Sequence, residues 1–326
     1  MGGDRAPDEI VAGALLASVG RVEPILVGPP ELDCGGLEHV IAHDVVGMHE
    51  KPVDAVRAKP GSSLVVACRL VAEGKADVVV SAGNTGAVLA ASLFTMRRVR
   101  GIYRPAIAAP IPAMRGPTVL VDAGANADAR PEHLLQFAYM GAVFAEEILA
   151  IERPVVRLLS IGEEAEKGNE LTRQTHELLA ASDLNFVGNV ESRRLLDGAA
   201  DVVVCDGFTG NVALKTIEGT SNTLLNALRS EAERSWRAKL GGLLLRPALR
   251  NLRHQLDPDT YGGAYLLGLR GLAVIAHGNS SREAVANAIR YAALGVEHRV
   301  VERVAEQMGS RVVASAGPKN PDRMMR

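Results

Sequence analysis

A short apolar strand, a glycine-rich loop and a helix follow one another several times along this chain of 326 residues. The clearest copy is VVVCDGFTGNVALK at residues 202–215, where an apolar run typical of a strand buried on both faces ends at Asp206-Gly207. Similar units are DVVVSAGNTG at residues 77–86 and TVLVDAGAN at residues 118–126. The first backbone N–H groups of a helix have no partner within the helix, so each unit presents donors above its strand end. Three such loops, each with an asparagine, predict one shared polar site.

The alternation of apolar runs with amphipathic helical patterns predicts an α/β fold with a parallel sheet. No low-complexity linker or tandem repeat divides the sequence, so we expect one interleaved domain over residues 1–308 and a flexible tail over residues 309–326. The predicted helices cover residues 8–19, 62–73, 85–97, 131–150, 169–181, 209–234 and 281–307. The predicted strands cover residues 24–28, 38–42, 77–81, 105–109, 118–122, 154–160, 184–188, 201–205 and 272–276.

Composition excludes several classes of protein. The net charge of −2 at pH 7 lacks the basic excess of a nucleic-acid binder, so no nucleic acid is expected as a partner. The three cysteines include no Cys-x-x-Cys pair, which fits neither a disulfide framework nor a structural zinc site and favours the reducing cytoplasm. No apolar stretch approaches the roughly 18–20 residues that a membrane span requires. We therefore expect a soluble cytoplasmic protein.

Residues 236–254 differ from the rest of the chain in charge. They contain five Arg or Lys residues and no acidic residue, and their leucines recur at helical spacing. Pro247 is expected to separate two short helices, which form a protruding amphipathic hairpin. Such a hairpin lies on an anionic membrane surface or docks a partner, whereas the alternative is a helix pair buried at a subunit interface. Under the first interpretation the membrane contacts are Leu240, Leu244, Leu245 and Leu249.

The loop Gly83-Asn84-Thr85-Gly86 opens a helix directly after a strand, a geometry suited to phosphate or carboxylate. It is neither a G-x-G-x-x-G fingerprint nor a Walker A sequence, so it does not imply a nucleotide. A single loop of this type is more often a simple strand–helix turn, but three similar loops in one chain favour a binding site.

Charged side chains lie near the same predicted strand ends. Lys215 lies one helical turn beyond Asn211, so both side chains can point at one bound anion. Lys167 belongs to a charged loop after another apolar strand, where a doubly wound sheet places ligands; the alternative is a solvated loop. His277, at a strand end, is the histidine best placed to titrate near neutral pH, although a lone histidine there is more often structural. Cys205 lies inside an apolar run and is predicted to be a buried, inert thiol.

Together these motifs resemble one family, the bacterial acyl-(acyl-carrier-protein):phosphate acyltransferases. The resemblance covers residues 1 to about 295, and so many long motifs in one order make coincidence implausible. The motifs are MGGDxAP at 1–7, KPxSS at 59–63, SAGNTG at 81–86, DxGAN at 122–126, LLQFAYMG at 134–141, IGEExxKGNE at 161–170, NFVGNVE at 185–191, CDGFTGNV at 205–212 and YGGA at 261–264.

The resemblance implies a three-layer α/β/α sandwich similar to phosphotransacetylase and to the isocitrate and isopropylmalate dehydrogenases, assembled as a homodimer. It implies an acyltransferase that moves a fatty acyl group from acyl carrier protein to inorganic phosphate and so supplies acyl phosphate for phospholipid synthesis. It also implies a cytoplasmic protein that associates peripherally with an anionic membrane, which favours membrane contact by residues 236–254. A membrane-bound glycerol-3-phosphate acyltransferase is then a candidate partner. Members of the family carry a further strand before the methionine that stands here as Met1.

The chemistry of this transfer explains loops rich in glycine and asparagine. Phosphate near pH 7 is already nucleophilic and a thiolate is a tolerable leaving group, so the enzyme must hold two anions and stabilise an oxyanion. No cofactor and no metal is expected. We assign phosphate binding to Gly83, Asn84 and Thr85, the transition state to Asn126, Asn211 and Lys215, and secondary catalytic roles to Lys167 and His277. Further binding positions are Gly86, Asp122, Gly124, Asp206, Gly207 and Gly210.

Two other functions stay open at this point. A phosphotransacetylase-type transferase uses a coenzyme A thioester in place of acyl carrier protein as the donor. A membrane-docked scaffold that binds acyl ligands without catalysis is the non-enzymatic alternative. The first predicts faster turnover of the coenzyme A thioester, and the second predicts a folded protein that yields no acyl phosphate.

Overall fold

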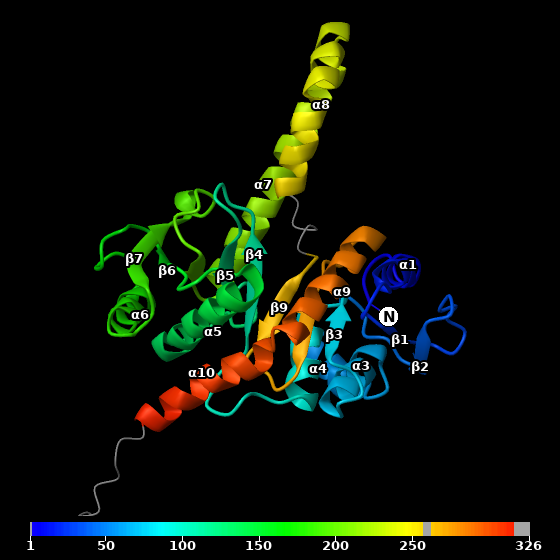
Figure 1. The fold of residues 1–326 in the computed structure, drawn as a ribbon, viewed down its shortest axis with the longest axis horizontal. Coiled ribbons are helices and arrows are strands. Elements are labelled where there is room, and N and C mark those ends of the chain that lie inside the picture. The colour runs from blue at the N-terminus through cyan, green and yellow to red at the C-terminus, as the bar shows by residue number, and fades with distance from the viewer. Residues whose placement is uncertain (1, 257–261, 316–326) are drawn as a thin grey trace, which may run out of the picture.

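The computed structural model describes residues 2–256 and 262–315, which form a mixed β-sheet with helices on both faces (Figure 1). The strands are β1 Ile25–Gly28, β2 Glu38–Ile41, β3 Val78–Ser81, β4 Ala106–Ile111, β5 Thr118–Val121, β6 Val156–Ser160, β7 Phe186–Glu191, β8 Val202–Val204, β9 Ala264–Leu267 and β10 Leu272–Ile275. The helices are α1 Asp8–Ala17, α2 Pro52–Ala58, α3 Ser63–Ala72, α4 Thr85–Thr95, α5 Pro131–Leu149, α6 Glu170–Ala180, α7 Gly207–Glu233, α8 Trp236–Leu256, α9 Arg282–Glu297 and α10 Val300–Ser315. The predicted α/β fold is confirmed.

The main sheet has eight strands in the order β3-β10-β9-β4-β5-β8-β6-β7, and β1 and β2 form a separate parallel pair. The sheet is mixed and not parallel throughout as predicted, because β9 is antiparallel to both of its neighbours and β5 is antiparallel to β4. β10 runs parallel to β3, and β8, β6 and β7 run parallel to β5. The carboxyl ends of β3 and β10 therefore point to one edge of the sheet, here called the β3–β10 edge. Those of β5, β8, β6 and β7 point to the other, here called the β5–β8 edge.

The helices that follow β5 and β8 lie on opposite faces of the sheet. Both strands are buried along their whole length, as their apolar sequences predict. Val121 and Val204 pack in the core that α5 covers, together with Phe137 of that helix. Leu120 and Val203 face the other way, into a smaller core that the first turns of α7 cover. The gap between the two strand ends is therefore a topological switch point, the place where open α/β sheets bind ligands.

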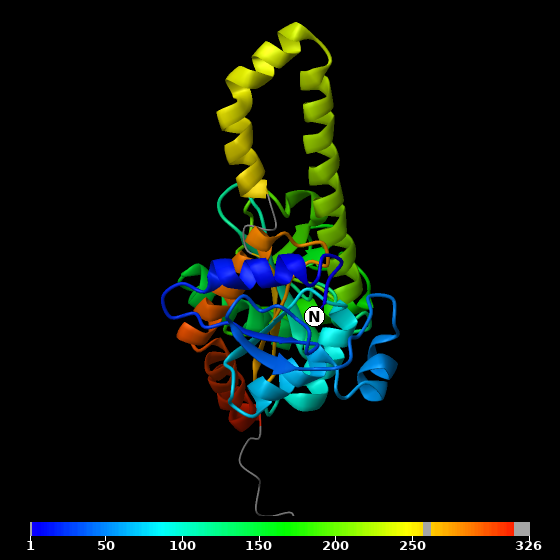
Figure 2. The same ribbon diagram turned by 90° about the vertical axis from the view of Figure 1, so that its right-hand side faces the viewer.

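α7 and α8 form a helical hairpin that projects from the body of the molecule (Figures 1 and 2). α7 begins at the β5–β8 edge, and its 27 residues carry it past the opposite edge. The prediction of two short helices separated by Pro247 is wrong, because α8 is one helix with that proline inside it. Pro247 is exposed, so water can bond the carbonyl that the proline leaves unpaired, and α8 changes direction along its course (Figure 2).

Other predicted boundaries also differ from the structure. The single helix expected over residues 281–307 is two helices, α9 and α10, because Arg299 between them adopts a φ of 53°. α10 continues to Ser315, past residue 309 where we placed the start of the tail, and the rest of that tail lies outside the described residues. α2 and β9 escaped prediction because each is too short to show a clear periodicity. None of the described helices has an apolar stretch long enough to cross a membrane.

Candidate active site

The loop after β5 forms the floor of the switch point and is organised by one carboxylate. Asp122, which is 0% exposed, accepts hydrogen bonds from the backbone N–H groups of Gly124, Ala125 and Asn126 at 2.7–3.1 Å. It also accepts one from the N–H of Ile107 on β4, at 3.0 Å. A buried carboxylate with this many N–H donors fixes a loop in one shape. The structure therefore gives Asp122, a predicted binding residue, the role of centre of the loop.

Asn126 uses both hydrogens of its side-chain amide within the protein. Its Nδ2 donates to Asp122 Oδ2 at 2.8 Å and to the Pro105 carbonyl at 2.7 Å, and the residue is 8% exposed. The amide thus has no donor left for an oxyanion. This geometry favours a loop-fixing role for Asn126 over the catalytic role predicted from the sequence.

The loop after β8 packs directly against the loop after β5. Gly207 N donates to the Asn126 carbonyl at 2.8 Å, and a Cβ on Gly207 would lie 2.7 Å from Asn126 N. A Cβ on Gly210 would lie 1.9 Å from the Asp122 carbonyl oxygen, so no other residue fits there. Two of the three glycine loops, all of which were predicted to share one site, therefore meet. Their glycines serve the contact between the loops.

The second turn of α7 presents Asn211 to solvent at this meeting point. Asp206 caps the helix, since its carboxylate accepts from the N–H of Thr209 at 2.9 Å and from the Thr209 hydroxyl at 2.7 Å. One turn further, Asn211 is exposed, and its Oδ1 would lie 3.5 Å from a Cβ placed on Gly124. Gly124 has a φ of +142°, which favours glycine. Asn211 thus lies with its side-chain amide against the exposed backbone of Gly124.

The charged loop after β6 lies at the same edge, because β6 runs parallel to β8. Glu163 Oε1 lies 2.6 Å from Arg194 Nη1, and this hydrogen bond holds the pKa of the Glu163 carboxyl below its usual value. The Lys167 carbonyl accepts from Ser160 Oγ at 3.0 Å, which anchors the lysine at the strand end. The Lys167 side chain is exposed, and no ion pair among the described residues includes it. Lys167 is therefore available to an anion at the β5–β8 edge.

The third glycine loop, after β3, lies at the opposite edge. Because β4 and β5 are antiparallel, the single shared site predicted from the three loops is in fact two clusters. The loop meets the N-terminal segment, where a Cβ on Gly2 would lie 3.1 Å from Gly83 Cα. That segment also meets the end of β10, since Asp4 N donates to the Gly278 carbonyl at 2.7 Å.

The loop after β3 is folded by its own side chains. Asn84 Oδ1 caps α4, and its Nδ2 donates to the Met48 carbonyl at 2.8 Å. Gly86 lies against Pro52, since a Cβ there would lie 2.6 Å from the proline ring. Thr85, the first residue of α4, is exposed. Of the residues predicted to bind phosphate here, Thr85 thus has a side chain directed to solvent, whereas the amide of Asn84 is engaged.

A charged cluster joins α7 to the β3–β10 edge. Lys215 Nζ lies 2.7 Å from Glu218 Oε2, and His277 Nε2 lies 3.9 Å from Glu218 Oε1. Lys215 therefore points along α7 toward His277 and away from Asn211, with which it was predicted to share an anion. The Glu218 side chain is 16% exposed, and its Oε1 is buried with no hydrogen-bond partner among the described residues.

Glu218 is the member of this cluster that sequence reasoning missed. Lys215 and His277 were predicted as site residues because they lie near glycine loops. Glu218 was not predicted, because an acidic residue in the middle of a long helix is usually a solvated side chain. The available signal was the spacing of three residues between Lys215 and Glu218, which places the two side chains on one helical face.

The structure confirms that Cys205 is buried. It is 3% exposed, its Sγ lies 3.6 Å from the Asp122 carbonyl, and burial raises the pKa of the thiol well above its ordinary value. A protonated, enclosed thiol is a poor nucleophile. Among the described residues, no three His, Cys, Asp or Glu side chains gather in a group able to hold a metal ion.

The fold and the switch-point site define an open α/β protein with a candidate ligand site at the ends of its strands. The crystal structure of a branched-chain phosphotransacylase from Enterococcus faecalis V583 matches with a TM-score of 0.60 and 17% identity, covering 91% of this chain and 97% of that chain. A phosphotransacetylase from Streptococcus pyogenes matches with a TM-score of 0.59 and 19% identity, covering 89% and 92%. At this level of identity the match concerns the fold, which agrees with the fold expected from the motifs.

Sequence comparison identifies the family within that class. The model of the family described as fatty acid synthesis protein matches residues 1–303. The phosphate acyltransferase of Pelotomaculum thermopropionicum is 48% identical, over 97% of this chain and 96% of the relative. That of Desulfitobacterium hafniense strain DCB-2 is 49% identical, over 94% and 96%. The chain belongs to the phosphate acyltransferase family, as its motifs predicted.

Proposed function

We propose that this chain transfers a fatty acyl group from acyl carrier protein to inorganic phosphate, and that the acyl phosphate serves phospholipid synthesis. Family membership supports an acyltransferase whose acceptor is phosphate. The observation in the structure that carries the proposal is the switch point of the β5–β8 edge, where Asn211 is exposed beside Gly124. An exposed glycine with a side-chain amide beside it, at a switch point, suits a ligand that must come close to the chain.

A direct displacement fits this site because it needs neither a protein nucleophile nor a strong base. A phosphate oxygen attacks the thioester carbonyl carbon, the C–O bond forms, and the C–S bond breaks as the thiolate leaves. The proton that phosphate still carries near pH 7 passes to the thiolate, so the step balances without a side-chain base. The buried Cys205, with its raised pKa, is consistent with the absence of an acyl-enzyme step.

Asn211 and Lys167 are the residues we assign to the reacting thioester. The Asn211 amide donates to the oxyanion of the tetrahedral intermediate, and Lys167 adds positive charge from the loop after β6. Donors that are already in place stabilise developing charge without reorganising during the reaction. Asp122 and Asn126 supply that preorganisation, since they fix the loop against which Asn211 lies.

Phosphate is assigned to the charged cluster of Lys215, Glu218 and His277. Lys215 links this cluster to Asn211. Lys215 and Asn211 are one helical turn apart, or about 5–6 Å along the axis, so an anion at Lys215 borders an acyl group at Asn211. The β3–β10 edge contributes Thr85 and the loop containing Gly83, while His277 lies beside Glu218. A bound phosphate would take Lys215 from Glu218 and leave that carboxylate to His277.

Acyl phosphate formation tests the function directly. The purified chain is incubated with palmitoyl acyl carrier protein and phosphate, and the product is trapped with hydroxylamine. The same assay with palmitoyl coenzyme A tests the alternative donor, which the phosphotransacetylase-like fold favours. Faster turnover of the coenzyme A thioester would reject the carrier-protein donor. A folded protein that forms no acyl phosphate from either donor would leave the non-catalytic scaffold.

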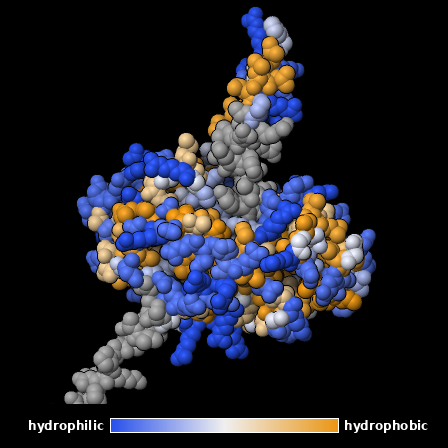
Figure 3. Space-filling view, viewed as in Figure 1, coloured by the Kyte–Doolittle hydropathy of each residue, from blue (hydrophilic) through white to orange (hydrophobic). Residues whose placement is uncertain are grey.

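Peripheral attachment of this cytoplasmic protein to an anionic membrane is proposed for the α7–α8 hairpin. Leucines of α8 are strongly exposed, with Leu240 at 54%, Leu244 at 76% and Leu245 at 59%, and Figure 3 shows apolar residues gathered along the projecting arm. Trp236, 71% exposed, suits a membrane interface, and Arg237 lies 5.4 Å from its ring. Each cation near an anionic bilayer contributes about 1 kcal/mol. The fourth predicted contact, Leu249, belongs to α8, but its side chain lies outside the described residues.

Vesicle flotation separates this role from a subunit interface. Leu244→Asp with Leu245→Asp should release the protein from vesicles that contain anionic lipid, and acyl phosphate formation in solution should continue. Val19→Asp, at a residue 70% exposed on the body of the molecule, is the matched control and should leave vesicle binding unchanged. A leucine variant that keeps binding vesicles but loses the homodimer that the family resemblance implies would show that the hairpin is an interface between subunits.

A further inference from the structure

Exposed arginines gather around the loop that leads into β4. Between Asp77 and Asp122 the chain contains no acidic residue. None of the ion pairs among the described residues includes these arginines, whereas other exposed arginines, such as Arg173 and Arg282, are paired with glutamates. The group, here called the arginine face, consists of Arg97, Arg98, Arg100, Arg104, Arg130 and Arg270.

Contacts along the backbone show that the members of the arginine face are neighbours. Arg270 donates from its backbone N to the Arg97 carbonyl at 3.0 Å and from Nε to the Arg98 carbonyl at 3.1 Å. Arg98 donates in turn to the Tyr103 carbonyl. The Tyr103 ring lies 6.0 Å from the ring of His133, the residue next to which Arg104 and Arg130 converge.

The arginine face contributes to the electrostatic environment of His133 on α5. Burial lowers the pKa of His133, and the positive charges of Arg104 and Arg130 lower it further, against an opposing effect of Glu132. Two arginines therefore dominate the local field even though an acidic residue is close. A face of this kind attracts a negatively charged partner.

The arginine face lies at the edge of the sheet that contains the switch point. β4 begins there, since Ala108 pairs with Val121 at the end of β5. The loop is bonded to the candidate active site, because the Pro105 carbonyl accepts from Asn126 Nδ2 at 2.7 Å. Gln136 of α5 holds the same loop, with the Gly101 carbonyl 2.8 Å from its Nε2.

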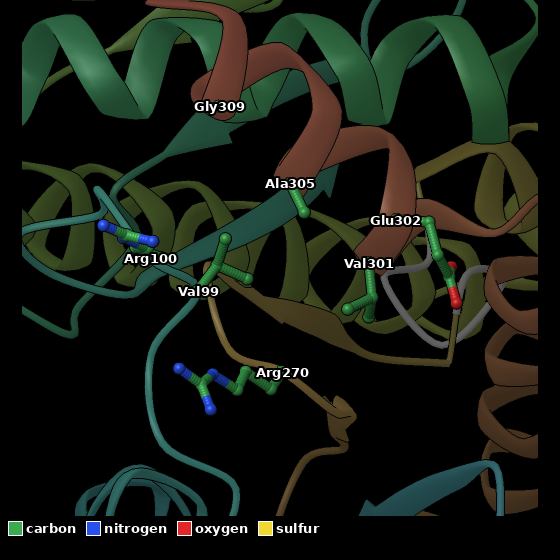
Figure 4. Close-up of a pocket in the computed structure, with 7 residues that line it drawn as sticks. All are labelled: Val99, Arg100, Arg270, Val301, Glu302, Ala305 and Gly309. Atoms are coloured by element: carbon green, nitrogen blue, oxygen red, sulfur yellow. The ribbon is translucent and has the colours of Figure 1, made fainter. Parts of the chain in front are cut away.

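A hollow of about 620 Å³ opens within this face (Figure 4). Val99, Val301 and Ala305 give it apolar walls. Arg100 and Arg270 extend from the opposite side to α10, and Glu302 is the acidic residue that borders it, on α10 (Figure 4). An apolar hollow with arginines at its rim is the pattern of a protein interface, in which arginine is enriched and acidic residues are scarce.

The position of the face argues for a protein partner and against a lipid surface. α7 carries the hairpin away from the β5–β8 edge, and α10 with its hollow lies at the other end of the molecule (Figure 1). A protein attached to a bilayer through the hairpin would turn the arginine face toward solvent. There it is open to a soluble acidic protein.

We propose that the arginine face is the docking surface for acyl carrier protein, whose acidic side chains pair with the arginines while an apolar side chain enters the hollow. This assignment rests on the proposed function, in which that protein brings the thioester. Docking at the β5–β8 edge places the carrier beside the switch point, so its prosthetic arm reaches Asn211 without crossing the molecule.

Charge reversal at the rim of the hollow tests the proposal. Arg100→Glu combined with Arg270→Glu should raise the KM for palmitoyl acyl carrier protein on the order of tenfold or more, because two attractive contacts become repulsive. The kcat/KM for palmitoyl pantetheine, which has no protein part, should stay unchanged. Binding of carrier protein without an acyl group, measured by calorimetry, should weaken by the same factor. The matched control is Arg21→Glu with Arg153→Glu, which makes the same change of charge at exposed sites outside the face.

Three results would overturn the docking surface. Equal losses with both donors would show damage to the active site, and unchanged carrier binding would place docking elsewhere. If the double arginine variant keeps carrier binding but loses vesicle binding or its oligomeric state, the arginine face contacts a membrane or a second copy of the chain. The calorimetric arm separates this proposal from the proposed function: wild-type protein that binds the carrier but forms no acyl phosphate would refute the function and keep the surface.

Discussion

The two edges of the sheet hold glycine loops of similar sequence in different ways. At the β5–β8 edge a carboxylate shielded from solvent, Asp122, collects backbone N–H groups from its own loop and from β4. At the β3–β10 edge the loop depends on Asn84, whose amide reaches the Met48 carbonyl, and on the N-terminal segment. The charged cluster beside it contains a glutamate, Glu218, with one buried oxygen that has no hydrogen-bond partner in the described part of the chain.

This difference distinguishes residues that fix the structure of a loop from residues that respond to a ligand. Where every polar group is satisfied, as around Asp122, a side chain is committed to shape. Where a buried oxygen has no partner among the residues that the structure describes, as at Glu218, the arrangement is ready to change when a ligand binds. Substitutions at the first position should act on folding, and substitutions around the second should act on kinetics.

The largest effect is expected from Asp122→Ala. Removal of the carboxylate leaves several buried N–H donors without partners, so the free energy of unfolding should fall by at least about 3 kcal/mol. Urea denaturation followed by circular dichroism measures this. Asp206→Ala, which removes only a helix cap, is the comparison and should cost about 1 kcal/mol. Equal losses would mean that Asp122 is no more than another cap.

Lys215→Ala sharpens the other half of the comparison. If Lys215 holds phosphate, the KM for phosphate should rise about tenfold, the effect of one lost charge–charge contact of roughly 1.4 kcal/mol, while the KM for the acyl donor stays the same. Steady-state kinetics with each substrate varied in turn gives both values. Lys239→Ala, on the exposed arm, is the control.

Glu218→Gln then decides what Lys215 is for. It keeps the shape of the side chain and removes the charge that competes with phosphate for Lys215. The KM for phosphate should therefore stay the same or fall. If Glu218→Gln and Lys215→Ala raise it alike, the lysine serves only the ion pair.

The smallest effect is expected from Cys205→Ala. Its thiol is buried and has a raised pKa, so at neutral pH it should not be alkylated by iodoacetamide in the folded protein. The alanine variant should keep most of the activity. Mass spectrometry after incubation with the acyl donor alone gives the opposing outcome, since an acylated Cys205 would contradict direct transfer.

Sequence periodicity predicted most helices and strands of this fold, but not the order and direction of the strands in the sheet. Apolar runs marked β5 and β8, whose residues are buried on both faces. The same runs carry no information on direction, so the antiparallel contact of β4 with β5 escaped prediction and one expected site became two. The prediction that Pro247 separates two helices was wrong because an exposed helix tolerates a proline that a buried helix does not.

The candidate site shows the same limit at the level of single side chains. The motifs selected the loops that contain Asn126 and Asn211, and both loops lie at the switch point. The two asparagines differ in their hydrogen-bond partners. The Asn126 amide donates to the carbonyl of Pro105, twenty-one positions before it in the chain, whereas the Asn211 amide is exposed. Such partners are set by packing, and no local pattern reveals them.

The rate of acyl phosphate formation by Asn211→Ala tests the central claim most directly. Single-turnover assays with palmitoyl acyl carrier protein and saturating phosphate, trapped with hydroxylamine, isolate the chemical step from product release. The account predicts a loss of roughly 10²–10³-fold, the effect of removing one oxyanion donor, in a variant that unfolds like the wild type. Asn222→Ala, further along α7 and also exposed, should react at the normal rate. A folded Asn211→Ala enzyme with the wild-type rate would contradict the account.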